Sequence, residues 1–388
     1  MRFGEGESGA ADRKLTGDRL ESRPYNSSVK QIAVLGATGS IGRQALEIVD
    51  AHPGLQVCAL ASGTHDIEAL AAERGVEHTQ VGGDLTALLD RAEPDIVLNA
   101  VVGFAGLPAT LWTLERGATL ALANKESLVA AGELALAARE RGGGLLLPVD
   151  SEHSALHQCL EGHAPETVHS LVLTASGGPF RGRSRDELAA VTRADALSHP
   201  TWRMGPKITI DSATLANKGL ELIEAHFLFG VPYERIEVVI HPTSLVHALV
   251  RFRDGGTLAH LGYPDMRVPI SYALTYPERA ATAVEPLDLS SGLRLEFEPP
   301  DLETFPLLAL ARRAGESGGT FPCAYNAANE VAVQAFLAGR LPFLGIAEVV
   351  VEALAEVDGA PASDLEELVE ADADARRHAE RAVGAAVT

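Results

Sequence analysis

Residues 31–42, QIAVLGATGSIG, decide the fold expected for the first third of this chain. A short apolar run, typical of a buried strand, leads directly into three glycines spaced GxxGxxG, and an amphipathic stretch at 41–51 follows. Glycines permit a tight turn, and the N-terminus of the next helix offers free N–H groups and a positive dipole end to a pyrophosphate. In this position the motif predicts a dinucleotide-binding domain, although GxGxxG is the commoner spacing.

The same alternation of short apolar runs and longer amphipathic stretches continues to residue 149. The expected strands lie at 31–35, 56–60, 96–98, 119–122 and 145–147. The expected helices lie at 41–51, 67–74, 85–91, 107–116 and 126–141. Such βαβ repetition predicts an α/β fold with a Rossmann-like, doubly wound parallel sheet across residues 29–149.

Beyond residue 149 the pattern changes, and we expect an α+β domain at 150–285 that includes one long helix at 211–229. Residues 286–305 are rich in proline and acidic residues, which is typical of a connector. Four amphipathic stretches then predict a helical bundle within 306–388. Residues 1–28 are polar and glycine-rich, without the apolar core of a secretory signal, and predict a disordered tail.

Composition excludes several classes of partner. The formal net charge of −21 argues against general binding of nucleic acid and against attraction to anionic membranes. Three cysteines without a CxxC pair suggest neither a disulfide framework nor a zinc site, so a cytoplasmic location is expected. No apolar run reaches the 18 residues of a membrane-spanning helix.

The motif PVDSEH at 148–153 places two carboxylates at the end of an expected strand. If the strand geometry continues, Asp150 and Glu152 point the same way and repel each other unless a cation or a proton lies between them. Hard divalent cations such as Mg²⁺ and Mn²⁺ take all-oxygen sites of this kind. A solvated acidic turn is the alternative, and the motif alone does not decide between them.

Two further segments of the first domain bear on the cofactor. The second expected strand ends without the carboxylate that usually accepts the 2′-hydroxyl of NAD, which favours NADP, although Thr64 and His65 supply no lysine or arginine. Asn124, Lys125 and Glu126 follow the fourth expected strand, at the sheet edge where ligands bind. Lys125 could pair with an oxyanion there, or it could be an exposed lysine at the start of a helix.

The second half carries three candidate groups for the substrate. Asn217, Lys218 and Glu221 share one side of a helix, so Glu221 could complete an acidic triad with Asp150 and Glu152. An ordinary amphipathic helix with a Lys–Glu pair explains the same spacing. The turn at 175–180 could meet an anion or could be a plain Gly-Gly turn, and the proline-bounded stretch at 198–207 could be a lid or could pack on the core.

At this point the chain resembles the 1-deoxy-D-xylulose 5-phosphate reductoisomerase family. The resemblance runs in order over about 350 residues and rests on these segments: GATGSIG at 36–42, LANKESL at 122–128, LPVDSEHSA at 147–155, ASGGPF at 175–180, HPTWRMGPKITIDSATLANKGLELIEA at 199–225, IHPTSLVH at 240–247, LGYPDMR at 261–267 and NAANE at 326–330.

The resemblance implies a role for each matching residue. The divalent cation, Mg²⁺, Mn²⁺ or Co²⁺, would be held by Asp150, Glu152 and Glu221. The implied NADPH contacts are Gly36, Thr38, Gly39, Ser40, Ile41, Gly63, Asn124, Glu126 and Gly205. The implied substrate contacts are Lys125, Ser151, Glu152, Ser176, His199, Trp202, Ser212, Asn217, Lys218 and Glu221. Among all of these, Lys125, Asp150, Glu152, His199 and Glu221 would be catalytic.

The resemblance also implies the reaction. Family members rearrange 1-deoxy-D-xylulose 5-phosphate and reduce it with NADPH to 2-C-methyl-D-erythritol 4-phosphate, in non-mevalonate isoprenoid biosynthesis. They are homodimers that pair through the sheet of the middle domain, here expected at 150–285, and fosmidomycin inhibits them. Two other functions fit the residues alone: a different NADP-dependent, metal-assisted enzyme such as a β-hydroxyacid oxidative decarboxylase, and a non-catalytic nucleotide sensor.

Overall fold

The computed structural model describes residues 29–386, and the tail predicted at 1–28 lies outside them. Its first layered unit is a six-stranded sheet in the order β3-β2-β1-β4-β5-β6, in which every pair of neighbours is parallel. The strands are β1 (Lys30–Leu35), β2 (Leu55–Ser62), β3 (His78–Val81), β4 (Ile96–Asn99), β5 (Thr119–Leu122) and β6 (Leu145–Pro148). The doubly wound parallel sheet expected from the sequence is confirmed.

Both faces of this sheet are buried, which is why its strands are nearly continuous apolar runs. In β1, Ile32 and Val34 belong to one apolar cluster, and Ala33 and Leu35 belong to another on the opposite face. The covering helices are α1 (Ser40–Ala51), α2 (Glu68–Arg74), α3 (Leu85–Ala92), α4 (Leu107–Glu115) and α5 (Lys125–Gly142). A distant helix, α11 (Arg267–Thr275), packs on the same face as α1.

The second sheet is mixed, with strand order β10-β9-β7-β8. Here β7 (Val168–Ala175) runs parallel to β8 (Ile236–Ile240) and antiparallel to β9 (Val246–Phe252), which pairs with β10 (Thr257–Leu261). The helices of this part are α6 (Ser151–Leu160), α7 (Arg185–Leu188), α8 (Arg193–Ala196), α9 (Pro206–Ala213) and α10 (Ala216–Phe229). Short 3-10 turns occupy Phe104–Gly106, Pro165–Thr167, Tyr233–Arg235 and Leu289–Ser291.

The prediction of one long helix at 211–229 is wrong, because the structure has two separate helices, α9 and α10, over this stretch. The first, α9, ends at Ala213, and Leu215 then adopts a left-handed conformation with φ of 60° before α10 begins. This break changes the direction of the chain between Asp211 and Asn217. It lets the two helices present their polar side chains to different neighbours.

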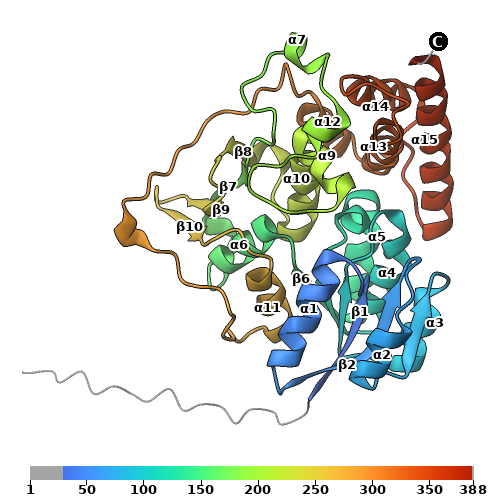
Figure 1. Ribbon diagram of the computed structural model, residues 1–388, viewed down its shortest axis with the longest axis vertical. Helices are drawn as coiled ribbons and strands as arrows, with labels where there is room; N and C mark the ends of the chain where they lie inside the picture. The colour runs from blue at the N-terminus through green and yellow to red at the C-terminus, as the bar shows by residue number, and fades with distance from the viewer. Residues whose placement is uncertain (1–28, 387–388) are drawn as a thin grey trace, which may run out of the picture.

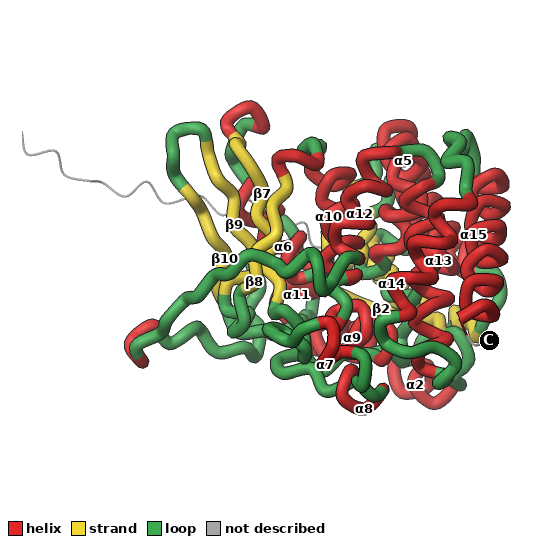
Figure 2. Tube along the Cα trace, turned by 90° about the horizontal axis from the view of Figure 1, so that it is seen from above, coloured by secondary structure: helices red, strands yellow, loops and turns green. Residues whose placement is uncertain are grey.

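Four helices complete the chain, as expected: α12 (Leu307–Ser317), α13 (Phe321–Leu337), α14 (Gly345–Glu356) and α15 (Leu365–Ala386). Figure 1 shows α13 and α15 above α5 of the first sheet and α12 beside α10, and Figure 2 shows the second sheet on the opposite side of the molecule. One apolar cluster joins α10 of the middle part to α12, α13 and α14. Among the helices of the described chain, none is long and apolar enough to cross a membrane.

Candidate active site

The glycine turn between β1 and α1 is forced by close packing. Gly36 has a φ of 85°, and a Cβ there would lie 2.5 Å from the carbonyl oxygen of Ala100. A Cβ on Gly42 would lie 2.3 Å from the carbonyl oxygen of Gly36. Gly39 caps α1 in an extended conformation. The turn therefore presents the N-terminus of α1 at the carboxyl edge of the sheet, where an anionic ligand is favoured.

A cavity of about 600 Å³ opens between the two sheets. Ser40 and Ile41 of α1 line one side, and residues of α6, α9 and α10 line the other. From the residues predicted to contact ligands, the cavity gathers Ser40, Ile41, Lys125, Asp150, Ser151, Glu152, Ser176, His199, Trp202, Gly205, Ser212, Asn217, Lys218 and Glu221. Residues more than 180 positions apart in the sequence therefore meet in one space.

Three carboxylates converge at the floor of this cavity. One oxygen each from Asp150, Glu152 and Glu221 lies within 4.8 Å of the others. The prediction that Asp150 and Glu152 alternate along a strand is wrong, because β6 ends at Pro148 and α6 begins at Ser151. Asp150 is instead the N-cap of α6, accepting a hydrogen bond from the backbone N–H of Glu152 at 3.2 Å. The capping geometry turns both carboxylates toward α10.

Two lysines compensate the carboxylates. Lys125 Nζ lies 2.6 Å from Asp150 Oδ2 and 2.7 Å from Glu221 Oε1. Lys218 Nζ lies 2.6 Å from Glu152 Oε1 and also donates to Glu221. Burial alone would lower the pKa of Lys125, but Asp150 and Glu221 outweigh it and hold that pKa well above its usual value. Both ammonium groups are therefore cationic, and Lys125 cannot act as a base at neutral pH.

His153 lies directly behind Asp150 and is fully buried. Its Nε2 donates to the backbone carbonyl of Glu221 at 2.9 Å, and its Nδ1 lies 3.1 Å from Asp150 Oδ1 and 3.1 Å from Glu224 Oε2. Burial alone would lower the pKa of His153, but Glu224 and Asp150 raise it to about 9. A cationic imidazole thus holds Asp150 in place from the side away from the cavity.

The donors suit a hard divalent cation. The three carboxylates of the cluster supply only oxygen atoms, which is the ligand type that Mg²⁺ and Mn²⁺ prefer. Four carboxylates, those of Asp150, Glu152, Glu221 and Glu224, also outnumber the three cationic groups of Lys125, Lys218 and His153. A metal ion would reduce the repulsion that remains among the carboxylates.

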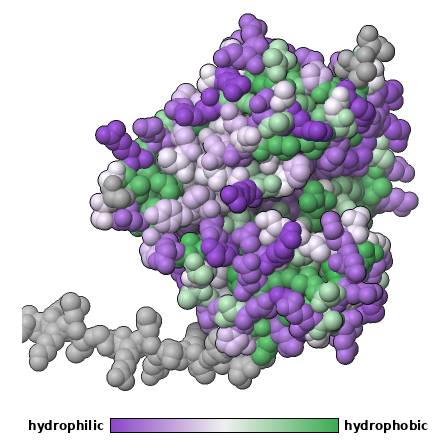
Figure 3. All heavy atoms as spheres, in the orientation of Figure 1, coloured by the Kyte–Doolittle hydropathy of each residue, from purple (hydrophilic) through white to green (hydrophobic). Residues whose placement is uncertain are grey.

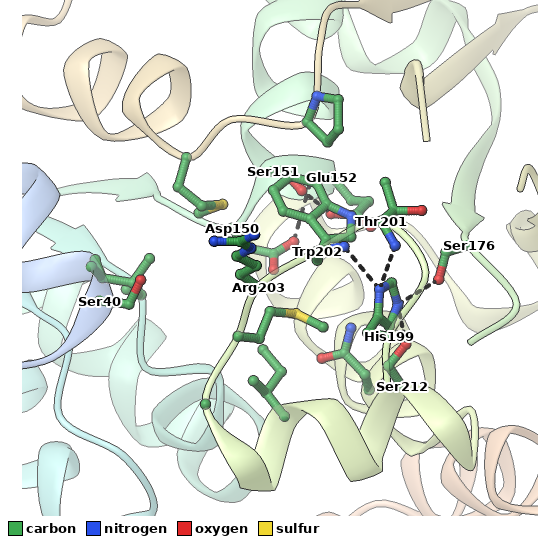
Figure 4. A pocket seen from close by; sticks show the side chains of 18 of the residues that line it. Ser40, Asp150, Ser151, Glu152, Ser176, His199, Thr201, Trp202, Arg203 and Ser212 are labelled. Atoms are coloured by element: carbon green, nitrogen blue, oxygen red, sulfur yellow. Dashed lines mark hydrogen bonds between the residues drawn. The ribbon is translucent and has the colours of Figure 1, made fainter. Parts of the chain in front are cut away.

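A second polar group lies in the same cavity, at the end of β7 (Figure 4). His199 Nε2 lies 3.0 Å from Ser176 Oγ and 3.1 Å from Ser212 Oγ. Its Nδ1 accepts hydrogen bonds from the backbone N–H groups of Thr201 and Trp202, at 3.1 and 2.9 Å. Burial lowers the pKa of His199, so the ring is neutral and carries its hydrogen on Nε2. Two hydroxyls and one ring N–H are thus available to an anion.

The residues from 198 to 205 form a loop that crosses the cavity and ends at α9. Trp202 projects from it into the cavity, and its ring lies 6.5 Å from that of His247. This places the proline-bounded stretch over the polar groups rather than in an apolar core. Its geometry is that of a cover for the cavity.

Several predicted cofactor residues do not line the cavity. Gly36, Thr38 and Gly39 form the turn that leads to it, and Gly63 directly follows β2. Asn124 and Glu126 are buried: the Asn124 amide donates to Glu126 Oε2 at 3.1 Å, and Lys207 Nζ lies 3.1 Å from Glu126 Oε1. Their side chains therefore serve an internal network at the sheet edge.

The sequence reasoning missed three kinds of residue. Asp265, Met266 and Arg267 line the cavity at the start of α11, beside α1, and Arg203 adds a second guanidinium to its wall. His153 and Glu224 were not singled out, and neither was Lys207. The segment LGYPDMR at 261–267, on which the resemblance partly rests, contains Asp265, Met266 and Arg267. The other four also lie in segments that carry the resemblance, His153 in 147–155 and Arg203, Lys207 and Glu224 in 199–225, but their spacing does not mark them.

A doubly wound sheet with a glycine turn faces, across one cavity, three clustered carboxylates and a neutral histidine between two serine hydroxyls. This arrangement is typical of a metal-assisted, dinucleotide-dependent oxidoreductase. Comparison with known families makes the class specific. The family model for 1-deoxy-D-xylulose 5-phosphate reductoisomerase matches residues 32–82 and 67–132. Models of that family's C-terminal domains match residues 146–229 and 261–378. The chain belongs to the 1-deoxy-D-xylulose 5-phosphate reductoisomerase family, as the resemblance predicted.

Individual relatives agree over nearly the whole chain. The 1-deoxy-D-xylulose 5-phosphate reductoisomerase of Symbiobacterium thermophilum is 50% identical over 377 residues, covering 89% of this chain and 97% of that relative. The Mycobacterium avium enzyme is 50% identical over 382 residues, covering 92% and 93%. A solved Zymomonas mobilis structure in complex with NADPH superposes with a TM-score of 0.83 at 41% identity, covering 91% and 99%. Another solved reductoisomerase, in complex with NADPH, fosmidomycin and magnesium, has a TM-score of 0.83 at 38% identity, covering 92% and 98%.

Proposed function

We propose that this cavity is the active site in which the chain converts 1-deoxy-D-xylulose 5-phosphate to 2-C-methyl-D-erythritol 4-phosphate, with NADPH and a divalent metal ion. One observation carries the proposal. The N-terminus of α1, the triad of Asp150, Glu152 and Glu221, and the group of Ser176, His199 and Ser212 all face one space of about 600 Å³. A reductase for a phosphorylated sugar needs these three parts within one substrate length of each other.

The metal would be held by Asp150, Glu152 and Glu221. When bound, a divalent cation supplies a Lewis acid that stabilises negative charge developing on a substrate oxygen. Lys125 is a permanent cation beside Asp150 and Glu221 and can donate a hydrogen bond to that oxygen. Glu152, which accepts a hydrogen bond from the hydroxyl of Ser151, is the carboxylate we assign to proton transfer.

The phosphate would be held at the other end of the cavity. The Nε2–H of His199 and the hydroxyls of Ser176 and Ser212 are the donors, and the backbone N–H of Gly178 steadies Ser176 at 3.2 Å. Binding energy from this remote group can close the loop at 198–205 over the cavity. Trp202 on that loop would then exclude water from the reacting carbons.

NADPH would bind at the carboxyl edge of the first sheet. Its pyrophosphate fits the N-terminus of α1, where Ser40 adds a hydroxyl, and the glycines that precede it allow the backbone to approach. Gly205, at the end of the loop, lines the same cavity and would face the nicotinamide end. Asn124 and Glu126 would shape that end through the network beneath it.

The test is NADPH oxidation on adding 1-deoxy-D-xylulose 5-phosphate, with and without Mg²⁺. We expect turnover that requires the metal and that fails with NADH. The controls are a Mg²⁺ chelator and an unphosphorylated sugar. NADPH binding without turnover under any of these conditions would contradict the proposal and would favour a nucleotide sensor.

We propose further that the chain is a homodimer that pairs through the second sheet. Apolar side chains are exposed on β10 and on the connector that follows α11, among them Leu258, Leu261, Leu289, Leu293 and Phe297. Figure 3 shows apolar groups gathered on the connector at the left of the molecule. A patch of this kind is a common interface between subunits. Sedimentation of the intact chain tests this, and a monomer at micromolar concentration would contradict it.

We also propose that the protein is located in the cytoplasm. Cys58, Cys159 and Cys323 are free thiols, and burial raises the pKa of Cys58 and of Cys159 to about 11. Such thiols are poorly reactive and suit a reducing compartment. Fractionation of cells that express the chain tests the location.

A further inference from the structure

The motif NAANE at 326–330 matched the family but has no role in the site described above. It lies on α13, in the C-terminal helical part, where Asn326 and Asn329 are buried and Glu330 is partly buried. Two of them join a set of ionic and polar side chains that we call the interdomain cluster. The interdomain cluster consists of Glu126 on α5, Lys207 and Asp211 on α9, Asn329 and Glu330 on α13, and Asp372 and Arg376 on α15.

The contacts of the interdomain cluster form two groups, which meet on α13 at the adjacent residues Asn329 and Glu330. Lys207 Nζ lies 3.1 Å from Glu126 Oε1 and 3.0 Å from Asp211 Oδ2. The Asn329 amide donates to Asp211 Oδ1 at 2.8 Å. Further out, Arg376 lies 2.7 Å from Glu330 Oε2. The cluster therefore ties three parts of the chain together at one point.

On one side the cluster reaches the loop that follows β4. The Asn124 amide, which donates to Glu126, also donates to the carbonyls of Val101 and Gly103 at 2.7 and 2.8 Å. Glu330 lies against the same loop, since a Cβ on Gly103 would lie 3.2 Å from Glu330 Oε1. This loop lies at the carboxyl edge of the sheet, where dinucleotides bind.

On the other side the cluster fixes the end of the loop at 198–205. Lys207 is the second residue of α9, and Gly205 immediately precedes that helix. The side chain of Lys207 is only 13% exposed, and those of Glu126 and Asp211 are 9% and 1% exposed. A buried charge that loses its partner is costly, so Glu126, Lys207 and Asp211 must move together.

We propose that Lys207, Asn329 and Glu330 are positioning residues that couple NADPH binding to closure of the loop carrying Trp202. NADPH settles against the loop after β4, Glu126 adjusts with it, and Lys207 transmits the adjustment to Gly205 and the start of α9. Asn329 and Glu330 hold the far side of the cluster still, so that α9 rather than α13 responds. This inference rests on the proposed function, because it takes NADPH as the ligand of that edge.

The charge balance of the cluster suggests suitable variants. Four carboxylates, those of Glu126, Asp211, Glu330 and Asp372, face two cations. Replacing Lys207 by methionine leaves only one cation and can impair folding. Glu330→Gln instead removes one excess negative charge and keeps the shape, so a stable protein is expected from it. Glu380, in an exposed ion pair with Arg340 of the same helical part, provides Glu380→Gln as the matched control.

The chain offers a direct optical readout, because Trp112 and Trp202 are its two tryptophans. Trp112 lies on α4, hydrogen-bonded to Asp90 and outside the cavity, so Trp112→Phe leaves Trp202 as the single reporter. In that background we would titrate NADPH, with Mg²⁺ present, into the parent, Lys207→Met, Glu330→Gln and Glu380→Gln proteins. Trp202 emission and the dissociation constant of NADPH would be measured together with the thermal unfolding temperature.

We expect Lys207→Met to raise the dissociation constant of NADPH about tenfold and to abolish the change in Trp202 emission that NADPH causes. We expect Glu330→Gln to raise the dissociation constant about threefold. Glu380→Gln should match the parent in both readouts. Binding within twofold of the parent and an unchanged Trp202 response, in folded Lys207→Met, would overturn the inference. If Lys207→Met does not fold, the same result in Glu330→Gln overturns it. A parent protein that binds no NADPH would instead overturn the proposed function.

Discussion

Replacing Glu221 by glutamine should separate the stability of the site from its chemistry. Glu221 is fully buried and accepts hydrogen bonds from Lys125 at 2.7 Å, from Asn217 at 2.6 Å and from Lys218. A glutamine keeps the shape but loses the charge. The two lysines then lose charge-assisted hydrogen bonds worth about 1.5–3 kcal/mol each. The substitution also removes an unfavourable charge. Burial, together with the negative charges of Asp150 and Glu152, destabilises the ionised form of Glu221 and raises its pKa.

These opposing effects largely cancel in the metal-free protein, so we expect its free energy of unfolding to change by no more than about 1 kcal/mol. The metal complex differs, because the cation loses one of its three carboxylates. Losing a buried charged partner costs about 3 kcal/mol, which weakens metal binding by about two powers of ten. We therefore expect weak Mn²⁺ binding and a collapsed kcat in a protein that unfolds near the parent temperature.

Two measurements test this prediction. Calorimetric titration with Mn²⁺ gives the metal affinity, and initial rates at limiting and saturating Mg²⁺ give the activity. Glu348→Gln is the control, because Glu348 pairs with Arg185 at the surface and is 60% exposed. Parent-like Mn²⁺ affinity in Glu221→Gln, or near-normal activity at limiting Mg²⁺, would refute the acidic triad as the metal site.

Three further predictions follow from the same cavity. Ser212→Ala removes one hydroxyl beside His199 and with it one hydrogen bond of about 1 kcal/mol. KM for the phosphorylated substrate should therefore rise about fivefold while kcat changes little. An unchanged KM in steady-state kinetics would exclude Ser212 from the phosphate site. Lys218→Ala removes the cation paired with Glu152 and one of the two cations paired with Glu221, so KM should rise and the unfolding temperature at pH 7 should fall. An unchanged KM would remove Lys218 from substrate binding. Burial lowers the pKa of His247 and of His260 to about 4, below the usual 6.5, so the folded state binds fewer protons than the unfolded chain between these values. The free energy of unfolding should be highest above pH 6.5 and should fall toward pH 4 by at most about 1.4 kcal/mol per pH unit for each histidine. Urea unfolding at several pH values measures this, and His260→Gln should make the fall with pH less steep. The same pH dependence in His260→Gln would show that His260 does not titrate as expected.

Much of the fold was predictable because it depends on local physics. The period-two burial in β1, with Ile32 and Val34 on one face and Ala33 and Leu35 on the other, follows from strand geometry, and the helices follow from 3.6-residue periodicity. The failures occurred where a capping or left-handed residue overrides the pattern. Asp150 starts a helix instead of extending a strand, and Leu215 divides one expected helix into two.

The candidate site was predictable only in part. The glycine turn at Gly36 and the pair Asp150 and Glu152 are contained in short segments, so their chemistry is visible in the sequence. Which carboxylate completes the triad was a hypothesis from spacing, and the structure brings Glu221 to the other two. The cationic neighbours of the carboxylates were harder to predict. Lys125 and Glu221 are 96 positions apart, and no local pattern in the sequence indicates that they form an ion pair.

The sequence by itself determined the class of the protein, through the glycine turn of a doubly wound sheet, an acidic motif of a kind that suits a metal ion and a run of family segments. Periodicity, glycine conformation and capping act over one or two turns, so residues a few positions apart are enough to specify them. Only the tertiary structure decided which groups face one another, such as His153 behind Asp150, or Asn329 against Asp211 across 118 positions. Contacts of that kind arise from the packing of whole elements, and a buried charge takes whichever partner that packing leaves within reach.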